Sequence, residues 1–352
     1  MKNKKCDTLY CGVRKAAIEE AHPDIDYNNL YHFKRFVIDR YRVHKRKDVH
    51  HLPSPWTINP IIQEFKFTNV RREHDRQTRY LIKNIIMNDE LTLEDKIVNC
   101  FMFRAWNNWY TLKDFGFPYS AKCLYDPNLK EKVRPIYKKL QNADSKRLWW
   151  SNAFIQGGSK AAWKFIDGDK ELDVKRCSNP EMDIPLRPFH VGVWIGRNHI
   201  VRKILASKNQ QECFEIIKSI KGFSDFLAYQ VFVDLTYIPE FPFSENEFVV
   251  AGPGCKRGLD LIFKTKDGMT YEECIFWLRD HINSKSDPLF SRLDSMYGSR
   301  LVYDPDKLFS DLPEYDRCMN VMSIENCMCE LSKYVKAANG TGRPRNRYKG
   351  GR

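Results

Sequence analysis

Carboxylates in three different settings are the side chains of this sequence best suited to accept a proton. Asp234 interrupts the apolar run VFVDL, whereas Glu245 and Glu247 lie in the polar run SENE. Glu330 precedes Lys333 by one helical turn. A carboxylate in apolar surroundings has a raised pKa and works as a base near neutral pH. Asp234 is therefore the first candidate for a catalytic base. Its structural alternatives are pairing with a buried arginine or capping of a helix, and the alternative for Glu330 is a surface pair with Lys333.

A second group of side chains, between residues 65 and 79, is suited to holding phosphate. If this segment is one continuous helix, positions 65, 69, 72, 76 and 79 share a stripe. The candidates there are Asn69, Arg72, Asp75, Arg76 and Arg79. Such side chains grip phosphate oxygens while an aromatic ring stacks on a base. A solvated helix face with Arg72 paired to Asp75 explains the same pattern.

Two glycine-containing turns could bring backbone N–H groups close to an anion. Gly222 lies between two helical segments, where a helix-hairpin-helix element would need a second glycine in place of Ser224. An ordinary helix–helix turn is the alternative. The second turn is Gly252-Pro253-Gly254-Cys255-Lys256-Arg257, in which glycines remove side-chain bulk and two bases add charge. A tight surface turn is the alternative there. The P-loop pattern G-x4-G-K-[ST] is absent from the sequence, which argues against a P-loop kinase.

The charge of the chain favours a polyanionic partner. Its 352 residues carry 58 Lys and Arg against 45 Asp and Glu, a formal net charge of +13. Nucleic acid and an anionic membrane surface both fit this surplus. Five of the ten residues from Arg343 to Arg352 are basic, and flexible arms of this kind bind nucleic acid in a salt-dependent way. Lys333 and Arg343 therefore join the candidates for phosphate contact.

Membrane insertion, secretion and metal binding are not expected. No apolar run approaches the length of a spanning helix, and the N-terminus MKNKKCDTLYCG lacks the apolar core of a signal peptide. We therefore expect a cytoplasmic protein. The eleven cysteines lack paired C-x2-C spacing, so we expect free thiols, no structural metal and no cofactor.

Apolar periodicity predicts an all-α protein with room for a small β element. Helices are expected over residues 27–47, from Pro60 to about 86, from Thr92 to Gly116 with a Thr92–Asp95 cap, over 128–165, and in two or three segments of 196–235. VFVDLTYI could form a strand, but helical periodicity competes. Composition suggests an N-terminal arm 1–26, a helical subdomain 27–165, a connecting loop 166–190, a second helical subdomain 191–338 with the hairpin and the glycine turn, and a basic tail 339–352.

Four segments together resemble the alpha-glutamyl/putrescinyl-thymine pyrophosphorylase family, whose helical module is also fused to kinases of 5-hydroxymethyluracil in DNA. The segments are PWTINPIIQEFKFTNVRREHDRQTRYL, LAYQVFVDL, AGPGCKRGL and MSIENCMCELSKYVKAANGTGRPRNRY, spread over nearly the whole chain. The resemblance implies a fold similar to helix-hairpin-helix DNA glycosylases, and it favours functional roles for the arginine stripe, the glycine turn and the C-terminal helix.

The resemblance also implies a substrate and a reaction. The partner would be double-stranded DNA with modified bases, and an amino acid or a polyamine would be the co-substrate. The amine would displace pyrophosphate from the methylene group of a phosphorylated 5-hydroxymethyluracil.

Two other functions stay open at this point. A glycosylase-like relative would excise a modified pyrimidine, as in defence against phages with modified DNA. Such enzymes usually carry an aspartate after the hairpin, whereas the corresponding window here holds Ser244, Glu245 and Glu247. The third possibility is a DNA-binding protein without catalysis, in which polar groups lining the pocket are dispensable.

Overall fold

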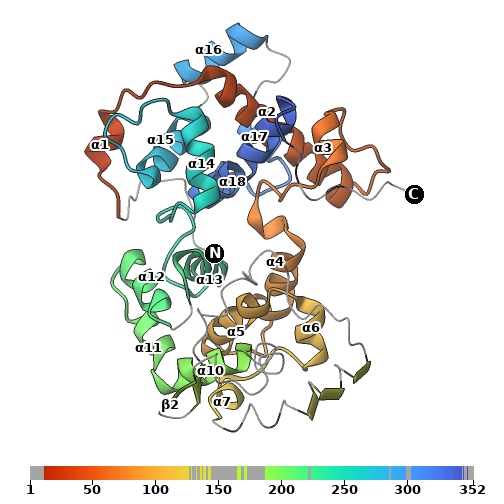
Figure 1. Cartoon of the computed structure of the whole chain (residues 1–352), viewed down its shortest axis with the longest axis vertical. Coiled ribbons are helices and arrows are strands. Elements are labelled where there is room, and N and C mark those ends of the chain that lie inside the picture. The colour runs from red at the N-terminus through yellow and green to blue at the C-terminus, as the bar shows by residue number, and fades with distance from the viewer. Residues whose placement is uncertain are drawn as a thin grey trace. The chain divides into compact units, whose positions relative to one another are not determined.

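The computed structural model shows a helical protein (Figure 1). It describes residues 12–126, 128, 132, 135–136, 138–139, 142–143, 165–167, 170–172, 187–220, 223–284, 287–298, 303–342, 344 and 347. The predicted all-α class is confirmed for these ranges, where helices make up the regular structure apart from one two-stranded hairpin. The hairpin pairs β1 (Phe165–Asp167) with β2 (Lys170–Leu172) in antiparallel register and supplies the small β element.

The chain divides into two compact units, which are described separately. Unit 1 is discontinuous and consists of Met1–Asp75 and Ser244–Arg352, whereas unit 2 is the continuous segment Arg76–Phe243. The loop 166–190, expected from its composition to join two subdomains, therefore falls inside unit 2. The sequence patterns do not predict this division, because the first boundary between the units, after Asp75, lies inside a segment expected to be one helix.

The helices of unit 1 come from both ends of the chain. The N-terminal part supplies α1 (Lys15–Glu19), α2 (Tyr27–His44) with a π-helix after it (Lys45–Val49), α3 (Pro60–Glu64) and a 3₁₀ turn (Arg72–His74). The C-terminal part supplies α14 (Pro253–Ile262), α15 (Tyr271–Asn283), α16 (Pro288–Tyr297), α17 (Pro305–Leu308), a 3₁₀ turn (Glu314–Asp316) and α18 (Val321–Ala338). The predicted helix 27–47 is thus confirmed, and Pro60 begins a helix as predicted.

Helix α18 contributes much of the core of unit 1. Ile324, Met328 and Leu331 on its apolar face are fully buried, and α14, α2 and α15 pack against it (Figure 1). The glycines of α14 allow a close approach. A Cβ atom on Gly258 would lie 2.2 Å from the Met328 carbonyl oxygen, and one on Gly254 would lie 2.9 Å from Sγ of Cys329. Gly254, expected to admit an anion, thus leaves room for a neighbouring helix.

Part of the expected N-terminal arm is fixed to α14 and α15. Arg14 donates hydrogen bonds of 2.8–2.9 Å to the Glu273 carboxylate from its backbone N–H, Nε and Nη2. These bonds hold the pKa of Glu273 at about 2, well below its ordinary value of 4.5. Ile25 forms an isolated antiparallel bridge with Phe263 just after α14. Residues 14–26 therefore belong to the folded body of unit 1.

Unit 2 contains the remaining helices. They are α4 (Arg76–Leu81) followed by a π-helix (Ile82–Ile86), α5 (Leu93–Trp106), α6 (Trp109–Asp114), α7 (Ala121–Leu124), α10 (Arg187–Arg197), α11 (Ile200–Leu205), α12 (Gln210–Lys218) and α13 (Asp225–Thr236). The predicted capping box of Thr92 and Asp95 begins α5. This helix ends before Asn107, which adopts the left-handed conformation, so Gly116 follows α6 rather than α5. α13 contains VFVDLT, so the strand alternative for this stretch is wrong.

The helix expected from Pro60 to about residue 86 is broken. α3 ends at Glu64, residues 65–71 lie outside any helix, and a 3₁₀ turn precedes α4. Phe65, Phe67 and Val70 are buried in the non-helical segment, so packing in unit 1 outweighs the local helical pattern. Positions 69, 72, 76 and 79 therefore do not share one helical stripe. The predicted helix over 128–165 lies largely outside the described residues.

Candidate functional site

A buried polar cluster lies beside α18 in unit 1. Asn326 on this helix donates a 2.7 Å hydrogen bond from Nδ2 to the Asn69 carbonyl oxygen, which holds the non-helical segment 65–71 along α18. The 3₁₀ turn that carries Arg72 follows directly. We call Asn69, Arg72, Asp75 and Glu325 the Arg72 cluster.

Asn69 and Asp75 fix the turn around Arg72. Oδ1 of Asp75 accepts hydrogen bonds of 3.0 Å from both the backbone N–H and Nδ2 of Asn69. Burial raises the pKa of Asp75, an effect opposed by Asn69 and Arg72. Oδ1 of Asn69 is buried and accepts no hydrogen bond from the described residues. Oδ1 of Asn69 is thus an acceptor without a hydrogen-bond donor among the described residues.

Arg72 is the most unusual member of the cluster. Its side chain is buried, with 7% of the residue exposed. Within the described ranges it makes no hydrogen bond and no ion pair, although Asp75 and Glu325 act on it electrostatically. A guanidinium group has five N–H donors, and none of the Arg72 nitrogens is among the fully buried unpaired atoms, so they keep some contact with solvent. An anion brought into this position would gain charge-assisted hydrogen bonds from Arg72.

Glu325 faces the start of α14. The residue is 4% exposed, and burial raises the pKa of its carboxyl group against the opposing effects of Arg72, the Cys329 thiol and the Gly252 backbone N–H. Gly252 is the N-cap of α14, and Pro253 is its first residue. The positive end of the helix dipole therefore lies near Glu325. The predicted glycine turn is a helix N-terminus, and one of its amides is directed at a carboxylate of the protein itself.

The other carboxylates proposed from the sequence have partners. Glu245 is buried and accepts a 3.0 Å hydrogen bond from Nδ2 of Asn320, the N-cap of α18. Glu330 is buried and accepts a 2.6 Å bond from Nζ of Lys333, so the expected pair is present. Glu247 is half-buried. Neither Glu245 nor Glu330 belongs to the Arg72 cluster, and their use as bases stays a prediction.

Asp234 lies in unit 2 and forms a bidentate ion pair with Arg104, at 2.5 Å from Nε and 2.6 Å from Nη2. The remaining Arg104 donors reach Asn107 Oδ1 and Thr78 Oγ1. The structure therefore favours the alternative in which Asp234 is the buried partner of an arginine. Its expected use as a base conflicts with this pairing, because both carboxylate oxygens are already occupied.

Arg76 and Arg79 also lie in unit 2, exposed on α4. Arg76 lies 5.6 Å from the ring centre of Trp109 and 5.0 Å from that of Tyr110. Trp109 stacks on Tyr110 and on Tyr80, with ring centres 3.7 and 5.1 Å apart. Unit 2 thus presents a cation beside partly exposed aromatic rings. Side chains of this kind can stack on a nucleobase.

The remaining phosphate-binding candidates have different settings. Lys256 and Arg257 are exposed on α14, with Lys256 Nζ 5.3 Å from the Tyr271 ring centre. Lys333 is half exposed. Gly222, the hairpin glycine, and Arg343 in the tail lie outside the described residues, so the helix-hairpin-helix element stays a prediction. Ser224, on the hairpin's far side, caps α13 by accepting from the Leu227 N–H.

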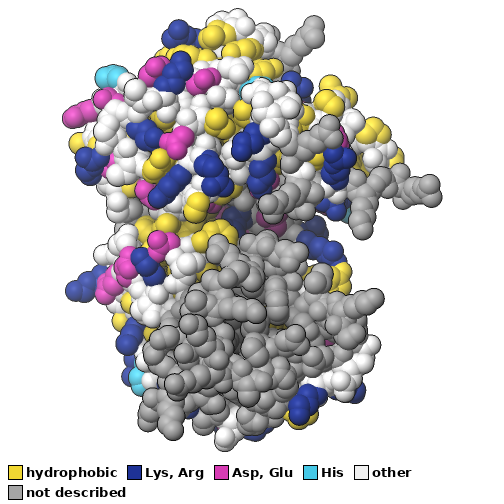
Figure 2. Space-filling view, in the orientation of Figure 1, with side chains coloured by type: hydrophobic (Ala, Val, Ile, Leu, Met, Phe, Trp, Pro, Cys, Tyr) yellow, Lys and Arg dark blue, Asp and Glu magenta, His cyan; other side chains and the backbone are white. Residues whose placement is uncertain are grey.

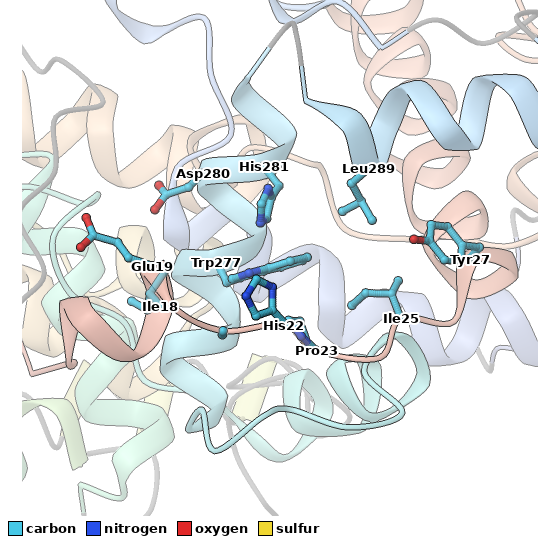
Figure 3. A pocket seen from close by; sticks show the side chains of 11 residues that line it. Ile18, Glu19, His22, Pro23, Ile25, Tyr27, Trp277, Asp280, His281 and Leu289 are labelled. Carbon is cyan, nitrogen blue, oxygen red and sulfur yellow. The ribbon is translucent and has the colours of Figure 1, made fainter.

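A pocket of about 490 Å³ lies between the N-terminal segment and α15 (Figure 3). The Trp277 ring lies across it, and Glu19 and Asp280 lie together at one end. Asp280 is 2.6 Å from Arg279, and His281 lies 2.7 Å from Asp287. The pocket shares no residue with the Arg72 cluster, and several of its polar groups are already paired, so we assign no ligand to it.

Glu325 is the residue that the sequence analysis missed. It stands in the quoted segment MSIENCMCE, from which Glu330 is the only carboxylate among the candidates for the base. The apolar spacing of Val321, Ile324 and Met328 places position 325 on the buried face of the helix. A carboxylate on the apolar face was the available signal. Cys318 corrects a second expectation, because it is disulfide-bonded rather than free.

The described helices and the cluster together define an all-helical protein with a largely buried arginine and a buried carboxyl group whose pKa is raised. The family model described as "5-hmdU DNA kinase, helical domain" matches residues 28–343, so the chain belongs to this family. The family resemblance inferred from the four sequence segments is thereby confirmed.

One curated relative is a protein of Bacillus phage SP10 described as a 5-hmdU DNA kinase. It is 21% identical over 311 residues, which cover 85% of this chain and 43% of the relative. The chain therefore spans less than half the length of that relative. No solved structure matches the chain. Among the described helices, none is long and apolar enough to cross a membrane, and the described residues contain no group of three or more His, Cys, Asp or Glu that could hold a metal.

Proposed function

We propose that this protein is an enzyme that modifies a pyrimidine in double-stranded DNA. Its substrate would be 5-hydroxymethyluracil pyrophosphate, and an amine, either an amino acid or a polyamine, would displace the pyrophosphate. Family membership and the name of the phage relative support a DNA base derived from 5-hydroxymethyluracil. The P-loop pattern is absent from the sequence, which favours a step other than phosphoryl transfer by a P-loop kinase.

The observation that carries this proposal is the largely buried Arg72 residue, whose side chain makes no hydrogen bond or ion pair with the described residues. In the proposed reaction the amine lone pair forms a bond to the exocyclic methylene carbon. The bond from this carbon to oxygen breaks, and pyrophosphate leaves with the electron pair. Arg72 would bind the departing anion, because a guanidinium matches phosphate oxygens in charge and geometry.

Glu325 is the base in this proposal. The attacking nitrogen becomes positively charged and must lose a proton, which a neighbouring carboxylate can accept. Burial raises the pKa of Glu325, which brings it closer to the range useful for a base near neutral pH. Arg72 and Glu325 act electrostatically on each other in unit 1, so the group for the leaving anion and the group for the proton occur together.

The aromatic group on unit 2 would contribute to DNA binding. An enzyme that acts on a base of a duplex takes that base out of the stack. Arg76 with Trp109 and Tyr110 provides rings and a cation of the kind on which a nucleobase stacks.

The proposal is tested by analysing the nucleosides of DNA after treatment with the protein. Duplex DNA with 5-hydroxymethyluracil pyrophosphate is incubated with the full chain and a panel of amino acids and polyamines, digested and examined by mass spectrometry. We expect a new nucleoside with the amine attached to the methylene carbon, together with released pyrophosphate. Release of free base would replace the proposal by a glycosylase, and unchanged DNA that is nevertheless bound would replace it by simple DNA binding.

Three variants separate chemistry from folding in this assay. Arg72→Ala and Glu325→Gln should each greatly reduce adduct formation while the melting temperature stays close to that of the unmodified protein. Lys336→Ala removes an exposed cation from α18 and serves as the matched control, with adduct formation retained. Normal adduct formation by Arg72→Ala would show that the leaving anion is held elsewhere.

A further inference from the structure

Four of the nine residues that line a second pocket of unit 1 are lysine or arginine. It has a volume of about 420 Å³ and lies between the C-terminal end of α2, the π-helix and α17. α2 and α17 pack against each other (Figure 1). Its basic lining residues are Arg42, Lys45, Arg46, His50 and Lys307, and Asp304 is the acidic one. No residue of the Arg72 cluster lines this pocket.

The end of α2 brings three of these cations to one side. Arg42, Lys45 and Arg46 are spaced i, i+3 and i+4, so they are neighbours on the helix surface. The helix then widens into the π-helix, in which the His50 N–H donates a 2.8 Å hydrogen bond to the Lys45 carbonyl oxygen. Lys307 comes from α17, which is distant in sequence. Two separate segments therefore direct positive charge at one pocket.

Not all of these cations are engaged. Lys45 donates from Nζ to Ser310 Oγ at 2.8 Å and lies 3.9 Å from Asp311, which holds it in place. Lys307 is 3.2 Å from Asp304, but its side chain is 87% exposed. Arg42 is exposed and makes no hydrogen bond or ion pair with any residue that the structure describes.

Favourable contact with the negative end of a helix dipole explains part of this arrangement. Basic residues in the last turn of α2 stabilise the helix C-terminus. This explanation does not extend to Lys307, which belongs to another helix and nevertheless lines the same pocket. The pocket therefore carries more positive charge than stabilisation of the C-terminus of α2 explains.

We propose that this pocket binds phosphate groups of the DNA backbone at a place separate from the reacting base. Long exposed cations around an open pocket suit phosphate contacts, which position a duplex without reading its sequence. Figure 2 shows that Lys and Arg side chains are spread over the visible face of unit 1, and this pocket adds a concave site to that surface charge. The inference rests on the proposed function, because that function makes DNA the partner.

The test measures DNA binding by the full chain as a function of salt. The double variant Arg42→Gln with Lys307→Gln removes two positive charges from the pocket. The matched control, Arg202→Gln with Lys203→Gln, removes two from the exposed face of α11 in unit 2. Fluorescence anisotropy with an unmodified duplex between about 50 and 200 mM salt gives the slope of log K against log salt. For the pocket variant we expect about tenfold weaker binding at the lower salt and a slope flatter by about 1–2, since each lost phosphate contact removes about 0.9.

The possible outcomes separate this inference from the proposed function. Equal losses in the pocket variant and the control would mean that only net charge matters, which overturns the inference. Unchanged binding by the pocket variant overturns it as well, while leaving the proposed function in place. Absence of DNA binding by the unmodified protein would instead refute the proposed function. The last measurement is a calorimetric titration with inorganic pyrophosphate. If the unmodified protein binds pyrophosphate tightly and the pocket variant does not, while the salt slope for DNA is unchanged, the pocket binds a free anion and the inference is overturned.

Discussion

Arg104 on α5 and Asp234 on α13 form a bidentate ion pair in the interior of unit 2. Arg104 Nε and Nη2 lie 2.5 and 2.6 Å from the two carboxylate oxygens, and the side chains are 2% and 0% exposed. Arg104 also donates from Nη1 to Asn107 and from Nη2 to Thr78. A charge pair at this depth joins two helices that are far apart in the sequence.

Asp234→Asn should therefore destabilise the protein rather than only slow its chemistry. The substitution leaves a buried guanidinium without its counter-charge, and breaking a buried pair in this way costs about 3–5 kcal/mol. Urea unfolding followed by circular dichroism measures this loss. Asp225→Asn on the same helix is the control, because Asp225 is 60% exposed and should change stability little. A fully stable Asp234→Asn variant without turnover would return Asp234 to the role of base.

Glu325→Gln should remove one limb of the pH profile of adduct formation. Burial raises the pKa of Glu325, and only the deprotonated carboxylate accepts a proton. The rate of the unmodified protein should thus rise as pH increases through this raised pKa. In the glutamine variant, we expect a residual rate that does not rise through this pH range. A variant that keeps the same limb would assign the titration to another group.

Gly258→Ala should separate α14 from α18. The new Cβ atom would lie 2.2 Å from the Met328 carbonyl oxygen, which is backbone and cannot rotate away. Forcing an atom into a packed contact typically costs about 1–3 kcal/mol. Arg257→Ala, one residue earlier and exposed, is the control for helix propensity and should leave the melting temperature almost unchanged. Equal melting temperatures for the two variants would contradict the close helix contact.

The ion pair of Arg14 and Glu273 should make the stability of the folded protein depend on pH in the acid range. The pKa of Glu273 is about 2 in the folded protein against an ordinary value of 4.5. Its contribution is present above pH 4.5 and disappears as the pH falls toward 2, because the unfolded chain then binds a proton that the folded protein does not. Arg14→Gln should flatten the decline of the urea midpoint within this pH window. The same decline in both proteins would show that other carboxylates cause it.

Local signals were reliable where the structure depends on neighbours in the sequence. The Thr92–Asp95 capping box, Pro60 at the start of α3 and the periodicity of α2 all concern residues a few positions apart. The segment 65–71 shows the opposite case. Its pattern continues a helix, but burial of Phe65 and Phe67 and the hydrogen bond from Asn326 hold it in another conformation.

The candidate site was predictable only in part for the same reason. Asn69, Arg72 and Asp75 were chosen from the sequence, and they do lie together, although in a 3₁₀ turn and the segment before it rather than on a helical stripe. Arg76 and Arg79, chosen with them, belong to the other unit. Glu325 was missed because its significance depends on Arg72 and on the start of α14, neither of which is near it in the sequence.

The discontinuity of unit 1 determines the order in which a ribosome can produce its parts. Unit 2 is continuous, so all its residues, Arg104 and Asp234 among them, are synthesised before α14, α15 and α18. The hydrogen bond between Asn69 and Asn326 spans 257 positions, and closing such a distant contact is slow. A nascent chain halted just before Val321 would thus contain every residue of unit 2 and no Glu325. The Arg72 cluster is among the last parts of the protein that translation allows to assemble.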